Sequence, residues 1–125
     1  MKLTRRLAVL TVLLSFSAVA VGSASASTVD ECQAKRATLR ANTVAAQTSF
    51  ANEKDFNGLV AKLDAASAKL AAGKNSDAVE KLLDFQTTLN ALATAPKPKA
   101  DPVVAQSLIA EAQGVIDCIN AIGTG

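Results

Sequence analysis

The sequence of 125 residues contains no histidine, tryptophan or tyrosine, and its single methionine is Met1. Histidine is the usual general base near neutral pH and a common metal ligand, so its absence removes nucleophile–base pairs of the Ser-His and Cys-His kind. Residues 73–77 lack the alternating oxygen ligands and the distal glutamate of an EF-hand calcium loop. The remaining candidates for acid–base chemistry are carboxylates, which the helical phase places on polar helix faces: Asp64, Asp77, Glu80 and Asp84. We therefore predict a protein that is not an enzyme, with no catalytic residue, no cofactor, no cofactor-binding residue and no metal ligand.

Basic and aromatic residues are also few outside the first 26 residues. That remainder carries ten basic and 11 acidic side chains, a formal charge of −1, and three phenylalanines as its only aromatic residues. Nucleic-acid binding calls for a positive surface and stacking platforms, so no nucleic-acid partner is expected. Lys35, Arg36 and Arg40 cluster, and we interpret the cluster as a solvated helix face.

The first 26 residues have the organisation of a secretory signal peptide. Lys2, Arg5 and Arg6 precede an apolar run at 7–21, and small residues occupy 24–26. The alternative, a membrane anchor, needs about 20 apolar residues and a basic cluster after them, and the sequence has neither. We predict cleavage after Ala26, secretion to the extracellular space, and no membrane anchor after cleavage.

Two amphipathic helices meeting at Gly73 organise the rest of the chain. One apolar stripe with steps of three and four precedes this glycine, and a second follows it. Their members are Phe56, Leu59, Leu63, Ala66 and Leu70, then Val79, Leu82, Phe85, Leu89 and Leu92. Gly73 suits the left-handed residue of a helix end, and Asn75 or Ser76 is expected to cap the second helix. So short a connection predicts antiparallel packing.

Two further helices are expected on either side of this pair. Residues from Ser27 to about Phe50 predict a first helix with a thin apolar seam, and Asn52 is a candidate cap for the next. A single helix over 29–72 is the alternative. Asp101-Pro102 predicts the start of a last helix that carries a broad apolar face and ends at Gly123.

The two cysteines, Cys32 and Cys118, decide between these alternatives. An even pair in a small exported chain predicts a disulfide, whose Cα atoms must lie about 5.5 Å apart. In an up-down-up-down bundle the start of the first helix and the end of the fourth lie at the same end. One long helix over 29–72 would separate the cysteines by tens of ångströms. We therefore predict one all-α domain over 27–125, an up-down-up-down four-helix bundle with a Cys32–Cys118 disulfide.

The packing pattern between Leu59 and Ile119 resembles that of the FIMAH domain. The match runs through Leu59-Val60-x-x-Leu63-x-x-Ala66, through Ala78-x-x-x-Leu82-x-x-Phe85, and through Ala105-x-x-Leu108-Ile109-x-x-Ala112. It covers residues 56–121, about half of the chain, and FIMAH domains are small helical modules of secreted bacterial proteins. The resemblance implies an accessory role in adhesion or interaction and carries over no catalytic residue. The disulfide, with Cys32 in an additional first helix, departs from the family pattern.

Two functions follow as hypotheses. The first is a secreted, bacterial, non-catalytic interaction or adhesion module, a monomer that binds a surface polymer or an extracellular protein. The second is a secreted inhibitor of an extracellular enzyme or a carrier of a small apolar ligand, because four-helix bundles can leave a groove or cavity between helices.

Overall fold

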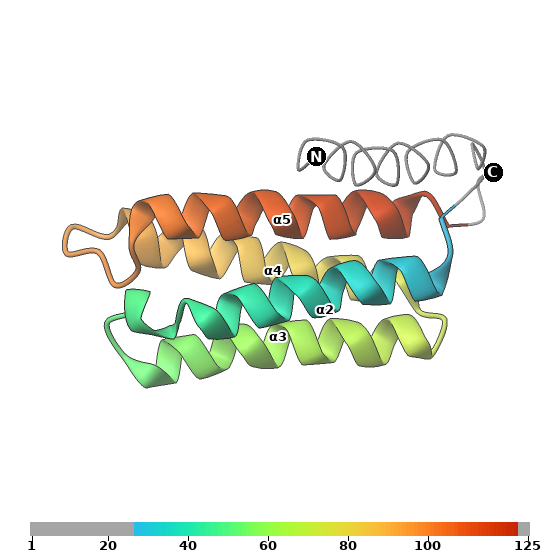
Figure 1. The fold of residues 1–125 in the computed structure, drawn as a ribbon, viewed down its shortest axis with the longest axis horizontal. Coiled ribbons are helices and arrows are strands. Elements are labelled where there is room, and N and C mark those ends of the chain that lie inside the picture. The colour runs from blue at the N-terminus through green and yellow to red at the C-terminus, as the bar shows by residue number, and fades with distance from the viewer. Residues whose placement is uncertain (1–26, 123–125) are drawn as a thin grey trace, which may run out of the picture.

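The computed structural model describes residues 27–122, in which four long helices form a bundle (Figure 1). In the labelling of Figure 1 the helices are α2 (Val29–Ala45), α3 (Glu53–Ala71), α4 (Asn75–Thr94) and α5 (Pro102–Asn120), and the short 3-10 helix η1 (Gln47–Ser49) follows α2. Each helix runs opposite to the one before it, and α2 packs against α5 as well as α3, which closes the ring. This confirms the predicted all-α up-down-up-down four-helix bundle. The predicted signal peptide and Gly123 lie outside the described residues.

Side-chain caps start three of the four helices. Thr28 Oγ1 accepts from the backbone N–H of Glu31, and the Glu31 side chain accepts from the backbone N–H of Thr28, which makes a capping box for α2. Asn52 Oδ1 accepts from the N–H of Asp55 and starts α3. Asp101 caps α5 ahead of Pro102, as predicted. The cap at Asn52 confirms the predicted break, so the alternative of one helix over 29–72 is wrong.

The turn between α3 and α4 differs in one respect from the prediction. Gly73 has the expected positive φ of 79°. The N–H of Lys74 donates to the carbonyl of Lys69 at 2.9 Å, the outer bond of a Schellman motif, and the chain re-enters a helix immediately. The cap position is therefore Lys74, which makes no side-chain capping bond, and Asn75 is already helical. The prediction that Asn75 or Ser76 caps α4 is wrong.

The first helix is also shorter than predicted. It covers 29–45 rather than Ser27 to Phe50, and after η1 the backbone of Phe50 is extended. Phe50 pairs there with Ala100 of the α4–α5 connection in an isolated antiparallel bridge. A helical Phe50 could not make this bridge, because its backbone groups would be turned into the helix.

Two backbone hydrogen bonds tie the α2–α3 and α4–α5 connections together at the end of the bundle opposite the Gly73 turn. Ala51 N–H donates to the Lys99 carbonyl at 2.8 Å, and Asp101 N–H donates to the Ser49 carbonyl at 3.0 Å. Figure 1 shows these two connections at one end and the α3–α4 turn at the other. The bundle is therefore pinned at both ends, here by backbone bonds and at the Gly73 end by the disulfide.

The core contains the side chains that the predicted stripes placed inside, and α3 buries its whole stripe. In α4, Leu82, Phe85 and Leu89 are buried, whereas Val79 and Leu92 are half-buried at its edges. The contribution of α2 is the smallest: Cys32, Leu39 and Thr43. Thr43 meets its hydrogen-bonding requirement inside the core by donating to the Leu39 carbonyl at 2.8 Å. Within residues 27–122, the helices are not long and apolar enough to cross a membrane.

Removing a core side chain from α4 should cost much of the stability of so small a domain. Leu82→Ala and Phe85→Ala each remove a fully buried side chain, and we expect each to lower the free energy of unfolding by about 2 to 5 kcal/mol. Urea unfolding followed by circular dichroism measures the change.

Leu83→Ala is the matched control, because Leu83 is on the same helix and is 47% exposed. Its cost should stay within about 0.5 kcal/mol. A loss at Leu83 equal to that at Leu82 would contradict the observed orientation of α4.

Candidate functional site

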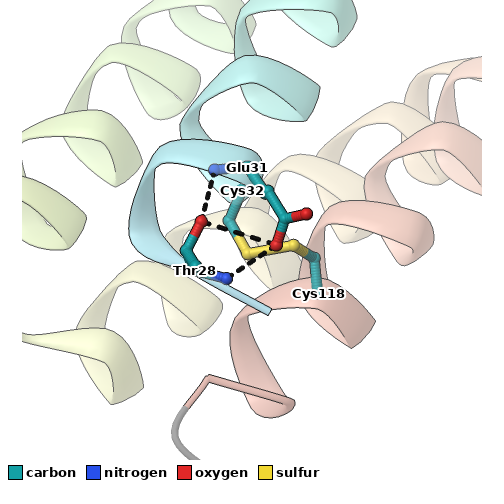
Figure 2. Close-up of a disulfide and its surroundings, with 4 residues drawn as sticks. All are labelled: Thr28, Glu31, Cys32 and Cys118. Carbon is teal, nitrogen blue, oxygen red and sulfur yellow. Dashed lines mark hydrogen bonds between the residues drawn. A yellow bond between two sulfur atoms is a disulfide. The ribbon is translucent and has the colours of Figure 1, made fainter. Parts of the chain in front are cut away.

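A disulfide joins the first turn of α2 to the last turn of α5 (Figure 2). Cys32 and Cys118 are both buried, with their Cα atoms 5.6 Å apart and a sequence separation of 86. The Thr28–Glu31 capping box lies beside the bond and sets the entry of the chain into α2. The structure confirms the predicted disulfide. The bond fixes the position of α2 relative to α5 at this end of the bundle.

The seam between α2 and α3 is lined by polar side chains that bond across it. Gln33 Nε2 donates to the Ser67 carbonyl at 3.0 Å, and Ser67 Oγ donates back to Gln33 Oε1 at 3.1 Å. Further along, Arg40 Nε donates to Asp64 Oδ1 at 2.7 Å, with a second contact between Arg40 Nη2 and Asp64 Oδ2 at 3.3 Å. Both partners are exposed enough for the pair to contribute little stability. These hydrogen bonds therefore fix the orientation of α2 relative to α3 and contribute little to stability.

The predicted basic cluster is divided between two seams. Lys35 lies at the α2–α5 seam, whereas Arg36 and Arg40 lie at the α2–α3 seam. Partial burial lowers the pKa of Arg36, partly opposed by the attraction of Asp64. The hydrogen bond that Arg40 donates to the Asp64 carboxylate raises the pKa of Arg40. Both guanidinium groups stay charged at neutral pH, but the three cations do not form one continuous patch.

The predicted surface carboxylates lie on α3 and α4, and Glu80 and Asp84 are one turn apart on α4. Asp64, Glu80 and Asp84 are exposed, as predicted, and Asp64 is paired with Arg40. Asp77 is half-buried and lies 4.0 Å from Lys69 Nζ across the turn. Within residues 27–122, no three His, Cys, Asp or Glu side chains gather as metal ligands would.

Three hollows lie along the described surface. The first, of about 320 Å³, lies between α2 and α5 and is lined by Lys35, Thr38, Glu111, Gly114 and Val115. The second, of about 340 Å³, is formed by the two connections, residues 48–51 and 98–102. The third, of about 360 Å³, lies between α4 and α5, and we call it the amide groove. It is lined by Gln86, Thr87, Asn90, Gln106, Ile109 and Gln113.

The amide groove contains a directed chain of hydrogen bonds. Gln86 Nε2 donates to the Ile109 carbonyl at 3.0 Å and to Gln113 Oε1 at 3.2 Å. Gln113 Nε2 in turn donates to Asp117 Oδ1 at 3.0 Å. An ionised carboxylate and a main-chain carbonyl can only accept hydrogen bonds. The acceptors at the two ends of this hydrogen-bond series therefore fix the orientation of both glutamine amides. Gln86 Oε1 is thereby left as an acceptor without a protein partner in the described part of the chain.

Sequence reasoning missed this groove. Gln86 and Asn90 are one turn apart on α4, and Gln106 and Gln113 are two turns apart on α5, so each pair could be placed on one helix face from its spacing. Uncharged polar residues on a helix face normally indicate only solvent exposure. Nothing in the spacing shows that the two faces meet, which depends on how α4 and α5 pack.

Comparisons of the chain with protein-family models, with curated proteins and with solved structures found no match. The resemblance to the FIMAH domain therefore stays a prediction based on its packing residues.

Removing the disulfide should weaken the domain without removing its helices. The bond closes a loop of 86 residues, and loss of that constraint should lower the free energy of unfolding by about 3 to 4.5 kcal/mol. The variant is Cys32→Ala with Cys118→Ala, because alanine adds no buried hydroxyl group. Thermal unfolding followed by circular dichroism should show a markedly lower Tm and retained helical signal in the cold.

Reduction and alkylation of the wild-type chain should lower Tm in the same direction. An unchanged Tm in both experiments would contradict the conclusion that the disulfide holds α2 in the bundle.

Proposed function

We propose that the chain is a secreted, non-catalytic interaction or adhesion module of the bacterial extracellular type. The observation that carries this proposal is the disulfide-closed bundle. A structural disulfide belongs to an oxidising compartment such as the extracellular space, and here it fixes the outer helix faces as a preformed surface. The FIMAH resemblance over 56–121 adds an accessory role beside other secreted proteins.

The chemistry of the described surface supports binding rather than turnover. In residues 27–122, Asp64 and Asp77 are each paired with a cation, and Glu80 and Asp84 are exposed to solvent, whereas acid–base catalysis needs titratable groups brought together in a shielded site. The hollows at the helix seams are shallow and lined in part by charged or amide side chains. Such linings favour a polar partner, a surface polymer or an extracellular protein, over a small apolar ligand.

Secretion itself is tested by the intact mass of the product. We expect a chain that begins at Ser27, because cleavage after Ala26 follows from the small residues at 24–26. Reduction should add the mass of two hydrogen atoms, as one disulfide requires. A secreted product that still begins at Met1 would contradict the proposed signal peptide.

The binding function is tested by retention of the purified, oxidised chain on cell envelopes and on immobilised secreted proteins from the producing organism. We expect saturable retention, and the same chain reduced, alkylated and heat-unfolded serves as the control for non-specific adsorption. Equal adsorption of folded and unfolded chain would remove the support for a binding surface.

The same preparation should not turn over esterase, glycosidase or peptidase substrates. Turnover that follows the protein through purification and is lost in Glu80→Gln or Glu111→Gln would replace the proposed function with an enzymatic one.

A further inference from the structure

We propose that the amide groove between α4 and α5 binds an uncharged oligosaccharide segment. This inference rests on the proposed function and names the class of surface polymer that the module recognises. It concerns the six residues that line the groove and two exposed apolar side chains, Leu83 and Val103, each one helical turn from a lining residue in its own helix.

The lining of the groove carries no charged side chain. None of its six lining residues is ionisable, whereas 19% of all residues are charged. In residues 27–122, a single carboxylate is hydrogen-bonded to the lining: Asp117 lies at the end of the series of amide hydrogen bonds and accepts from Gln113. A polyanion would find no cation in this groove with which to pair, so an uncharged ligand is the better match.

The lining offers the mixture of donors and acceptors that sugar hydroxyl groups require. In residues 27–122, the side chains of Thr87, Asn90 and Gln106 make no hydrogen bond to protein, and Gln86 keeps a free Oε1. An amide both donates and accepts, as a hydroxyl group does. Gln86 is also held in place by its bonds to Ile109 and Gln113, so little side-chain entropy is lost when it binds a ligand.

Two exposed apolar side chains lie one helical turn from lining residues of the groove. Leu83 is 47% exposed and precedes Gln86 and Thr87 by one turn of α4. Val103 is 78% exposed and precedes Gln106 by one turn of α5. Because the helices are antiparallel, these residues lie toward opposite ends of the groove. They offer apolar contact to the C–H faces of sugar rings, in a chain without tryptophan or tyrosine to do so.

The length of the groove favours several sugar units over one. From Gln106 to Gln113 the α5 axis advances by about 10 Å, and without an aromatic stacking platform each single contact is weak. Affinity then has to come from contacts repeated along a chain, so a polymer segment is the expected ligand and a monosaccharide is not.

The test is a titration of the ¹⁵N-labelled oxidised chain, residues 27–125, followed by NMR. The probes are hexamers of β-1,4-linked glucose, α-1,4-linked glucose and β-1,4-linked N-acetylglucosamine, with polygalacturonate as the charged comparison. We expect at least one neutral hexamer to shift the side-chain amide signals of Gln86, Asn90, Gln106 and Gln113, while Asn57, which is exposed on α3, stays unchanged.

A double variant, Asn90→Ala with Gln106→Ala, should weaken binding of that hexamer about tenfold or more, since it removes two exposed side chains that hydrogen-bond the ligand. Asn57→Ala is the matched control and should bind as the wild type does. Circular dichroism of both variants checks that the bundle is intact. Absence of shifts with all neutral hexamers, shifts confined to other surfaces, or equal affinity of the double variant would each overturn the proposal.

Envelope retention of the double variant and of the wild type distinguishes failure of the groove proposal from failure of the proposed function. Envelope retention that survives in the double variant would overturn the groove as the binding site and leave the interaction module standing. A wild-type chain retained on no envelope or secreted protein would overturn the proposed function, and the groove proposal with it. Preferential shifts with polygalacturonate would replace the neutral ligand with an anionic one.

Discussion

The bond between Cys32 and Cys118 is the constraint on which the closure of the bundle depends. The helices α3, α4 and α5 follow one another and share broad apolar faces, whereas α2 buries only Cys32, Leu39 and Thr43. A helix with so narrow a seam gains little from hydrophobic burial, because stabilisation scales with the apolar area removed from water. The disulfide compensates by joining α2 to α5, the helix farthest from it in sequence.

The opposite end of the bundle is closed without covalent chemistry. The backbone bonds between residues 49–51 and 99–101 hold the two long connections against each other, and the rings of Phe50 and Phe56 pack with their centroids 5.6 Å apart beneath them. With both ends held, the helix seams are fixed relative to one another. Polar side chains that bond across those seams, as Gln33 does with Ser67 and Gln86 with Gln113, then keep defined positions.

Such a frame suits recognition by preformed surfaces. A ligand that meets side chains already held by neighbours pays less ordering entropy than one that must organise them. In the amide groove, Asp117 and the Ile109 carbonyl orient the two glutamines. The seam between α2 and α3 is organised equally well, but its ion pair satisfies its own charges and leaves less hydrogen-bonding capacity for a partner.

Local signals in the sequence determined most of the architecture. The stripes on either side of Gly73, the caps at Asn52 and Asp101, and the cysteine pair predict four helices in one antiparallel order, because each depends on residues within a few positions or on one geometric requirement. Tertiary structure alone decided two other features: the extended Phe50 that pairs with Ala100, and the division of the basic cluster between two seams. It also created the amide groove. Helical periodicity places a residue on a face, but which two faces meet depends on the rotation of each helix about its axis, and that rotation is set by the packing of the whole core.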